Sequence, residues 1–247
     1  MKIDTHSHLL YSKEAAPDWR AINFHFNMAK VSGLDVVCVT EHLDALHYSE
    51  LINSLFQQNC FAGEILEDGI IQLVNSVIIS SAAEVSLKGG ADVGLHVKPT
   101  VLQILNKNKG YYTLDTLVDE VASLTDDFII VGHHLYRPGK WIEDIEEKAK
   151  FLDAIELPAK DIVQSKKYES LRISLDKPFV AGSDAHTWIQ LGVGHTIIKE
   201  EEYKEKYIFN IKSLKKTIND NKLSVQILSE SEKIIQMSGM YRQYLLA

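Results

Sequence analysis

The sequence contains only two cysteines, Cys38 and Cys60, so it cannot depend on a framework of disulfides. Its longest apolar runs, such as residues 128–131, have the length of a strand and fall far short of the roughly 20 residues that a membrane helix needs. The first residues carry no apolar core behind their charge, so a secretory signal is not expected. These absences predict reduced cysteines, no membrane partner and a cytoplasmic location.

Basic residues are also scarce relative to acidic ones, with 26 against 34 and a formal net charge of -8. Proteins that hold nucleic acid by releasing counterions usually carry the opposite balance, so charge argues against nucleic acid as a partner. The acidic excess and the ten histidines permit a site for several divalent cations, whose charge would reverse the local field.

No linker, low-complexity segment or repeat of fixed period divides the 247 residues, so a single domain over 1–247 is expected. A helix is predicted from Asp18, its N-cap, to Ser32, followed by a buried strand over 35–40. The same order recurs in the helix at 114–124 and the strand at 128–132. Further strands are expected at 3–8, 77–85, 93–97, 151–157, 178–182 and 196–199.

Apolar strands that alternate with helices indicate an α/β fold, with a parallel sheet covered by helices. About seven or eight such repeats indicate a closed barrel. The segment 203–247 is rich in charge and has a helical pattern, so it is expected to form terminal helices that close the barrel or pack on its flank.

Most histidines follow predicted strands, at the end of a barrel where active sites are built. Asp4, His6 and His8 are spaced two apart, so an extended chain points all three to one side. Imidazole is a preferred ligand of zinc, iron and manganese, and Asp4 can orient one ring by accepting its other N–H. The alternative interpretation of this motif is a polar edge strand with two solvated histidines.

The other predicted strands carry the same residue types. The candidates are His42, Glu84, His96, His133 with His134, and Asp184 with His186. Glu84 follows a strand too apolar to hold an unpaired charge cheaply, so it needs a cation. His133 and His134 cannot both face one centre from a regular strand; His133 directly ends the strand and is the expected ligand, whereas a register shifted by one would select His134. The donors exceed what one metal ion can use and indicate a polynuclear centre.

These motifs occur in the order found in one family of enzymes. The pieces are Asp4-Thr-His6-Ser-His8, Thr40-Glu-His42, Glu84, His96, Val131-Gly-His133 and Gly182-Ser-Asp184-Ala-His186. Over about residues 1–200 the chain resembles the polymerase and histidinol phosphatase (PHP) family of metal-dependent phosphoesterases. The resemblance implies a distorted (β/α)7 TIM-like barrel with two or three divalent metal ions, which are zinc, manganese or iron.

The resemblance also implies how the ligands are shared. One ion would take His6, His8, Glu84 and Asp184, a second would share Glu84 and add His96 and His133, and a third would take His42 and His186 with one ligand from the loop after the first strand. The family often has an aspartate or histidine there, whereas this chain has Lys13 and Glu14. Either Glu14 substitutes as the ligand or Lys13 neutralises a phosphate.

The expected reaction is hydrolysis of a phosphate ester, similar to that of a histidinol phosphatase, by water that the metal ions activate. A small phosphorylated molecule is the expected substrate. His134, a metal-bound water or a nearby acid would deliver the proton to the leaving group. Arg137, together with Lys98 or Lys160, would hold a phosphate oxygen.

Two other functions compete with this hypothesis. The Asp-Thr-His-Ser-His opening also resembles TatD-type deoxyribonucleases and amidohydrolases, although the Thr-Glu-His and Asp-Ala-His pieces favour a phosphoesterase. A metal-binding regulatory module without catalysis is the third possibility, and the departure at Lys13 supports it.

Overall fold

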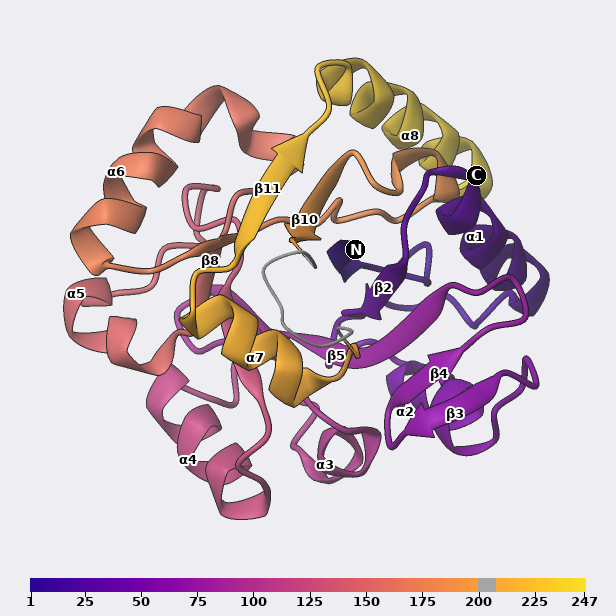
Figure 1. Ribbon diagram of the computed structural model, residues 1–247, viewed down its shortest axis with the longest axis horizontal. Helices are drawn as coiled ribbons and strands as arrows, with labels where there is room; N and C mark the ends of the chain where they lie inside the picture. Colours follow the sequence, from indigo (N-terminus) through magenta and orange to yellow (C-terminus); the bar gives the residue numbers. More distant parts are fainter. Residues whose placement is uncertain (200–207) are drawn as a thin grey trace.

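The computed structural model describes residues 1–199 and 208–247. Within these ranges, one mixed sheet of eleven strands curls into a nearly closed barrel with helices around its outside (Figure 1). The strands are β1 (Lys2–Ser7), β2 (Val36–Val39), β3 (Glu64–Glu67), β4 (Ile70–Gln72), β5 (Ile78–Ser86), β6 (Asp92–His96), β7 (Ile129–Gly132), β8 (Ala154–Glu156), β9 (Phe179–Val180), β10 (Gly194–Ile198) and β11 (Leu223–Ile227). The predicted α/β barrel is confirmed.

Along the chain most helices come between barrel strands, as the alternating pattern of the sequence predicts, and in space they surround the barrel. The α-helices are α1 (Trp19–Val31), α2 (Tyr48–Ile52), α3 (Pro99–Ile104), α4 (Leu114–Leu124), α5 (Ile145–Lys148), α6 (Ser165–Leu175), α7 (Ile211–Asn219) and α8 (Ser231–Leu246). A π-helix, η1 (Asn53–Gln57), and the 3-10 helices η2 (Ala149–Phe151), η3 (Ala159–Gln164) and η4 (Trp188–Gln190) complete the set in the described ranges. Asp18 caps α1 as expected, because its side chain accepts from the backbone of Arg20 and Ala21.

The strand order is β11-β10-β1-β2-β5-β6-β7-β8-β9, and β3 and β4 form a hairpin that pairs with β5. The pairs β1–β2, β2–β5, β7–β8 and β8–β9 are parallel, as expected for strands joined through helices. β6 instead runs antiparallel to both β5 and β7. Only residues 87–91 separate β5 from β6, too few for a parallel crossover, and this short connection distorts the barrel.

The barrel closes where the segment after β9 runs beside β1. The amide of Asp184 donates to the carbonyl of His6 at 2.7 Å, and the amide of His8 donates to the carbonyl of Ala185 at 2.8 Å. Gly182 permits this approach, since a Cβ on it would collide with the backbone nitrogen and the Cβ of His6. The first and last motifs of the sequence therefore lie next to each other.

An apolar cluster fills one mouth of the barrel. It combines inward-facing strand residues such as Ile3, Val36, Ile129, Val131, Ala154 and Val180 with Phe209, Ile211, Leu214 and Ile218. The last three belong to α7, which lies across the ring of strands in Figure 1 and covers the mouth at which they begin. Polar residues are left to the opposite mouth, where the parallel strands end.

The terminal segment 203–247 contains a strand as well as helices, and its residues 203–207 lie outside the described ranges. Strand β11 separates α7 from α8 and pairs antiparallel with β10. Leu223, Val225 and Ile227 alternate with polar residues, a period of two that the helical interpretation of the segment overlooked. No described helix combines the length and the apolar character that crossing a membrane requires.

The tight approach at Gly182 predicts a large effect of one added methyl group. Gly182→Ala is expected to lower the free energy of unfolding by about 1–3 kcal/mol, because β1 must move away from the segment after β9. Gly239→Ala in α8 is the matched control, since a Cβ there meets nothing within 4 Å and should stabilise the helix by about 0.5–1 kcal/mol. Urea denaturation measures both; equal stability of Gly182→Ala and wild type would contradict the close approach.

Candidate metal centre

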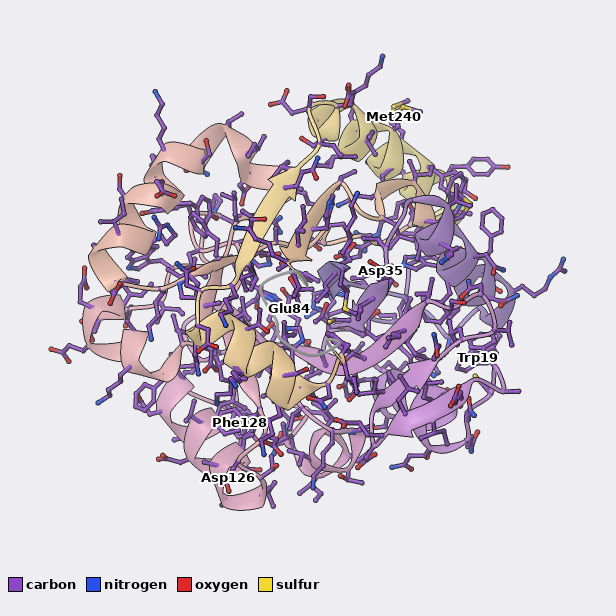
Figure 2. The ribbon with its side chains drawn as sticks, in the orientation of Figure 1. Trp19, Asp35, Glu84, Asp126, Phe128 and Met240 are labelled. Atoms are coloured by element: carbon purple, nitrogen blue, oxygen red, sulfur yellow. The ribbon has the colours of Figure 1, made fainter. Side chains whose placement is uncertain are left out.

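Polar side chains at the ends of several strands come together in groups of possible metal ligands. One of them, Glu84, lies near the middle of the ring of strands (Figure 2). Val131 and Ala154 belong to the inner apolar cluster. His133 and Glu156 follow them by two residues, so the pleat of β7 and β8 aims both side chains to the inside. The same alternation that builds the inner core therefore places the polar groups above it.

The first strand needs an irregularity to reach the same centre. Ile3 packs into the inner cluster, so regular alternation would turn His6 and His8 away from it. The pairing of β1 with β2 shifts between Asp4 and Ser7, and such a shift changes the face on which later side chains lie. The Nε2 atoms of His6 and His8 consequently face each other at 3.1 Å.

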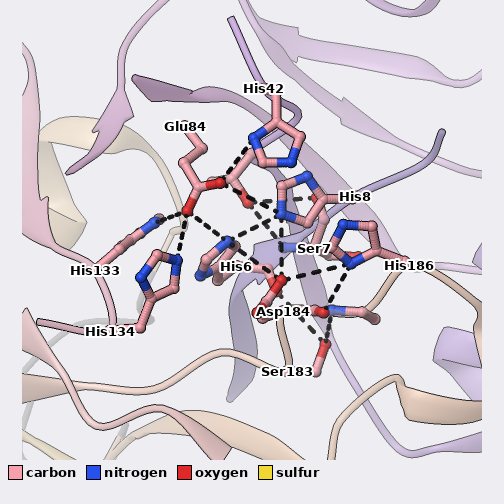
Figure 3. A network of polar contacts seen from close by, with 12 residues as sticks. His6, Ser7, His8, His42, Glu84, His133, His134, Ser183, Asp184 and His186 are labelled. Atoms are coloured by element: carbon pink, nitrogen blue, oxygen red, sulfur yellow. Dashed lines mark hydrogen bonds and ion pairs between the residues drawn. The ribbon is translucent and has the colours of Figure 1, made fainter. Parts of the chain in front are cut away.

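The donor atoms form three groups whose members lie within 4.8 Å of one another (Figure 3). The first contains His6, Glu84, His133 and His134, the second contains His8, His42 and His186, and the third contains His6, His8 and Asp184. Because His6 and His8 each belong to two groups, the three groups form one continuous centre. The structure thus brings together most of the ligands that the sequence predicted from distant strands.

Two expected ligands lie outside these groups. His96 is buried in β6, its Nδ1 has no hydrogen-bond partner in the described ranges, and burial beside His133 lowers its pKa to about 3. Glu14 is exposed on the loop after β1. Its neighbour Lys13 forms an ion pair with Asp44, with 2.7 Å between Nζ and Oδ1.

His134 joins His133 among the donors, although only one of the two was expected to face the centre. Its Nε2 lies 3.0 Å from Oε1 of Glu84, the same oxygen that Nδ1 of His133 approaches at 3.0 Å. Regular strand geometry would separate two adjacent side chains, but His134 has a φ of 29° and the chain turns there. Both histidines therefore face Glu84.

Two buried glutamates that the sequence analysis did not identify contact the Nδ1 atoms of His6 and His8, on the side of each ring away from the centre. Nδ1 of His6 donates to Glu156 at 2.7 Å, and Nδ1 of His8 lies 3.2 Å from Glu41. Such carboxylate–imidazole pairs fix the orientation of metal-binding histidines. The argument that identified Glu84 as a candidate applies to these two residues as well, since Glu41 and Glu156 are also acids at the ends of buried strands.

Asp4 does not orient an imidazole, in contrast to the expectation from its spacing. Its carboxylate accepts the backbone amides of Ser183, His6 and Gly192 at 2.9, 3.2 and 3.2 Å. Burial raises the pKa of Asp4 to about 6. Asp4 therefore ties β1 to the segment after β9, next to Gly182.

Buried carboxylates at the centre favour positive charge on the groups beside them. Burial acts to lower the pKa of His6, but the Glu156, Glu84 and Asp184 carboxylates raise it well above its ordinary value. Burial likewise opposes protonation of His8, yet Glu41 and other acids raise its pKa to about 9. Metal cations bound among these groups would stabilise the buried carboxylates in the same way as protonated histidines do.

The donor set fits metal ions. Nδ1 of His42 lies 2.8 Å from Oε2 of Glu84 without the angles of a hydrogen bond, and Nδ1 of His134 is buried without a partner in the described ranges. Nitrogen and oxygen donors that converge in this way suit zinc, manganese or iron. Glu84 faces donors from the first and second groups, so it is placed to be shared between ions.

Cationic side chains border the centre. Nη1 of Arg137 and Nζ of Lys160 each lie 2.9 Å from Oδ2 of Asp184. Although burial opposes it, Lys160, His6 and Arg137 hold the pKa of Asp184 well below its ordinary value. Both cations line a cavity of about 390 Å³ above the metal centre, whereas Lys98 lines a different cavity.

Comparison with known proteins identifies the class of this chain. Residues 166–212 match a family model described as PHP-associated. The whole chain is similar to the crystal structure of PsfC from Pseudomonas syringae PB-5123, with 34% identity over 99% of this chain and 98% of that chain, and a TM-score of 0.88. The chain belongs to the PHP family of metal-dependent phosphoesterases. A comparison with curated proteins found no match.

The fold is also shared with DNA-cleaving enzymes. The lesion-specific endonuclease PfuEndoQ from Pyrococcus furiosus is 19% identical over 89% of this chain, with a TM-score of 0.60. Endonuclease Q in complex with a 27-mer duplex substrate, with an abasic lesion at the active site, is 17% identical over 89% of this chain, also with a TM-score of 0.60. The chain spans 56% of the length of each endonuclease.

These endonucleases correct one expectation. The argument from net charge against nucleic acid as a partner is wrong, because the same fold binds a DNA duplex at its active site in endonuclease Q. Net charge averages over the whole surface, whereas a substrate meets the local field of bound ions and nearby side chains. An overall charge of -8 therefore excludes neither nucleic acid nor a smaller anion.

The contact between Glu156 and His6 predicts a loss of metal affinity in Glu156→Gln. The amide cannot supply the negative charge that fixes the Nδ1 proton, so affinity should fall by about 10–100-fold. Titration against a coloured chelator measures the change, and Glu64→Gln on the exposed strand β3 is the control. Wild-type affinity in Glu156→Gln would show that this carboxylate does not support the centre.

Proposed function

We propose that the protein hydrolyses phosphate esters, as a histidinol-phosphatase-like phosphoesterase would. The observation that carries this proposal is the continuous centre of imidazoles and carboxylates beneath a cavity lined by Arg137 and Lys160. Divalent ions at this centre would lower the pKa of water and neutralise charge on phosphoryl oxygens. His6, His8, His42, Glu84, His133, His134, Asp184 and His186 would hold them.

Glu41 and Glu156 prepare the imidazoles for this role. Each accepts from an Nδ1 atom, which leaves Nε2 of His8 and of His6 as the nitrogen facing the centre. All four side chains are buried, so bulk water does not compete for these hydrogen bonds. The ligand geometry is therefore set before an ion arrives.

Arg137 is placed to hold the phosphate. Nη1 and Nε are held by Asp184 and Asp161, so the guanidinium is fixed in orientation. Nη2 is buried and has no hydrogen-bond partner among residues 1–199 and 208–247. A phosphate oxygen would satisfy this N–H group, and Lys160 beside it would add a second positive charge. Glu14 has no part in this proposal because it is exposed.

Cleavage of a phosphodiester in nucleic acid is a second candidate, favoured by the barrel that the chain shares with endonuclease Q. The two candidates differ in what surrounds the scissile phosphate. A phosphomonoester ends at the phosphate and fits a cavity of about 390 Å³, whereas a polynucleotide must leave the cavity on both sides. Hydrolysis of p-nitrophenyl phosphate in preference to bis(p-nitrophenyl) phosphate is the expected result, whereas cleavage of duplex DNA with an abasic site would support the second candidate.

Removal of metal is expected to abolish hydrolysis. Chelation should stop the release of p-nitrophenol, and zinc, manganese or iron should restore it, because the chain's buried donors are the proposed ligands. Elemental analysis before and after chelation gives the metal content. Full activity in protein shown to be free of metal would refute the proposed function.

Glu84→Gln is expected to reduce both bound metal and turnover, the latter by about 100-fold or more. Glu84 is the carboxylate that donors from two groups approach, so its charge is central to the site. Glu64→Gln again serves as the control, since Glu64 is exposed on β3. Unchanged metal content and turnover in Glu84→Gln would remove the site from the mechanism.

A further inference from the structure

The cavity above the metal centre is lined by more cations than one phosphate group requires. Its basic residues are Lys13, Lys109, Arg137, Lys140, Lys160 and Arg242, whereas its carboxylates are Glu84, Asp92 and Asp184. Arg137 and Lys160 contact Asp184 beside the donors. The remaining cations lie in the same cavity and have no role in the proposed hydrolysis.

Arg242 lies on the C-terminal helix α8 and lines the cavity. Its Nε donates to the carbonyl of Tyr11 at 2.6 Å, so the guanidinium is held over the loop that follows β1. Arg242 lines the same cavity as His42 and His186 of the second group of donors. No carboxylate within the described ranges forms an ion pair with Arg242, in contrast to Arg137.

The cavity also carries positive charge beside His134. Nζ of Lys140 contacts Oδ2 of Asp92 at 2.5 Å, and the same oxygen lies 3.9 Å from Nε2 of His134. Asp92 therefore offsets the charge of Lys140. Lys109 is exposed at the rim. Arg242 is the cation of this cavity that is held in place by a hydrogen bond and forms no ion pair with a carboxylate within the described ranges.

We propose that the substrate is a small phosphate ester that carries a second anionic group, and that Arg242 binds this group. The proposal rests on the proposed function, which assigns the scissile phosphate to the metal centre, Arg137 and Lys160. A guanidinium that is held in a confined cavity and forms no ion pair there gains most from a ligand that brings an anionic group to it. A carboxylate or second phosphate a few bonds from the ester supplies that charge within about 390 Å³.

Two substrates of nearly equal shape test this selectivity. 3-Phosphoglycerate has a carboxylate where glycerol 3-phosphate has a hydroxymethyl group, so the pair isolates the second charge. The metal-loaded protein is expected to show a kcat/KM at least about 10-fold higher for 3-phosphoglycerate, mainly through KM. Arg242→Ala should reduce this ratio towards one, and Arg242→Lys should keep part of it. Lys233→Ala, on the exposed side of α8, is the control and should keep the full ratio.

A binding measurement does not depend on turnover. Sulfoacetate carries two anionic groups and methanesulfonate carries one, and neither is a phosphate ester. Sulfoacetate should raise the Tm of the metal-loaded protein more than methanesulfonate does, and Arg242→Ala should remove the difference. Thermal unfolding of the variant without ligand shows whether α8 still folds.

The outcomes separate this inference from the proposed function. Hydrolysis of glycerol 3-phosphate and 3-phosphoglycerate at equal kcat/KM would overturn the role of Arg242 and leave the phosphoesterase intact. Absence of hydrolysis of every phosphate ester would overturn the proposed function, while the sulfoacetate shift would still decide whether Arg242 binds a second anion. Cleavage of duplex DNA in place of both small esters would overturn the small dianionic substrate.

Discussion

The burial of Glu84 among imidazoles is the interaction on which the site depends. Its Oε1 lies within 3.3 Å of His6 and 3.0 Å of both His133 and His134, and its Oε2 lies 2.8 Å from His42. A carboxylate is costly in a nearly water-free environment unless positive charge surrounds it. The pKa of Glu84 is well below its ordinary value because, although burial opposes this, His6 and the other histidines stabilise the charged form. The barrel places a charge where only cations can satisfy it.

The two mouths of the barrel differ in the residues that line them. At one mouth α7 covers an apolar cluster, whose burial stabilises the fold. At the other mouth the strands end in acids and histidines, which by themselves would repel or remain unsatisfied. Glu41, Glu156 and Asp4 use backbone amides and ring nitrogens to fix these groups in place. Under the proposed function, this separation would let a chain with a net charge of -8 bind anionic substrates, because the local cations and the metal ions held there would outweigh the distant surface charge.

Much of the fold and of the metal centre could be predicted from the sequence, because strand periodicity and residue type are local properties. Short, nearly continuous apolar runs located most of the barrel strands, and the acids and histidines at their ends located the donors. The antiparallel course of β6 and the strand β11 were missed, since pairing direction and partner depend on contacts far along the chain. Only one of His133 and His134 was expected to face the centre because a regular strand was assumed, whereas a φ of 29° turns His134 toward Glu84 as well.

The sequence by itself determined which chemistry is available: imidazoles and carboxylates at alternating positions after buried strands, with the spacing of the PHP family. Only the tertiary structure decided which of them meet. Gly182 brings β1 against the segment after β9, and α8 returns Arg242 to Tyr11, a contact that spans 231 positions of the chain. Such contacts leave no periodic trace in the sequence, because closure of the barrel, and not the order of the residues, sets the distance between them.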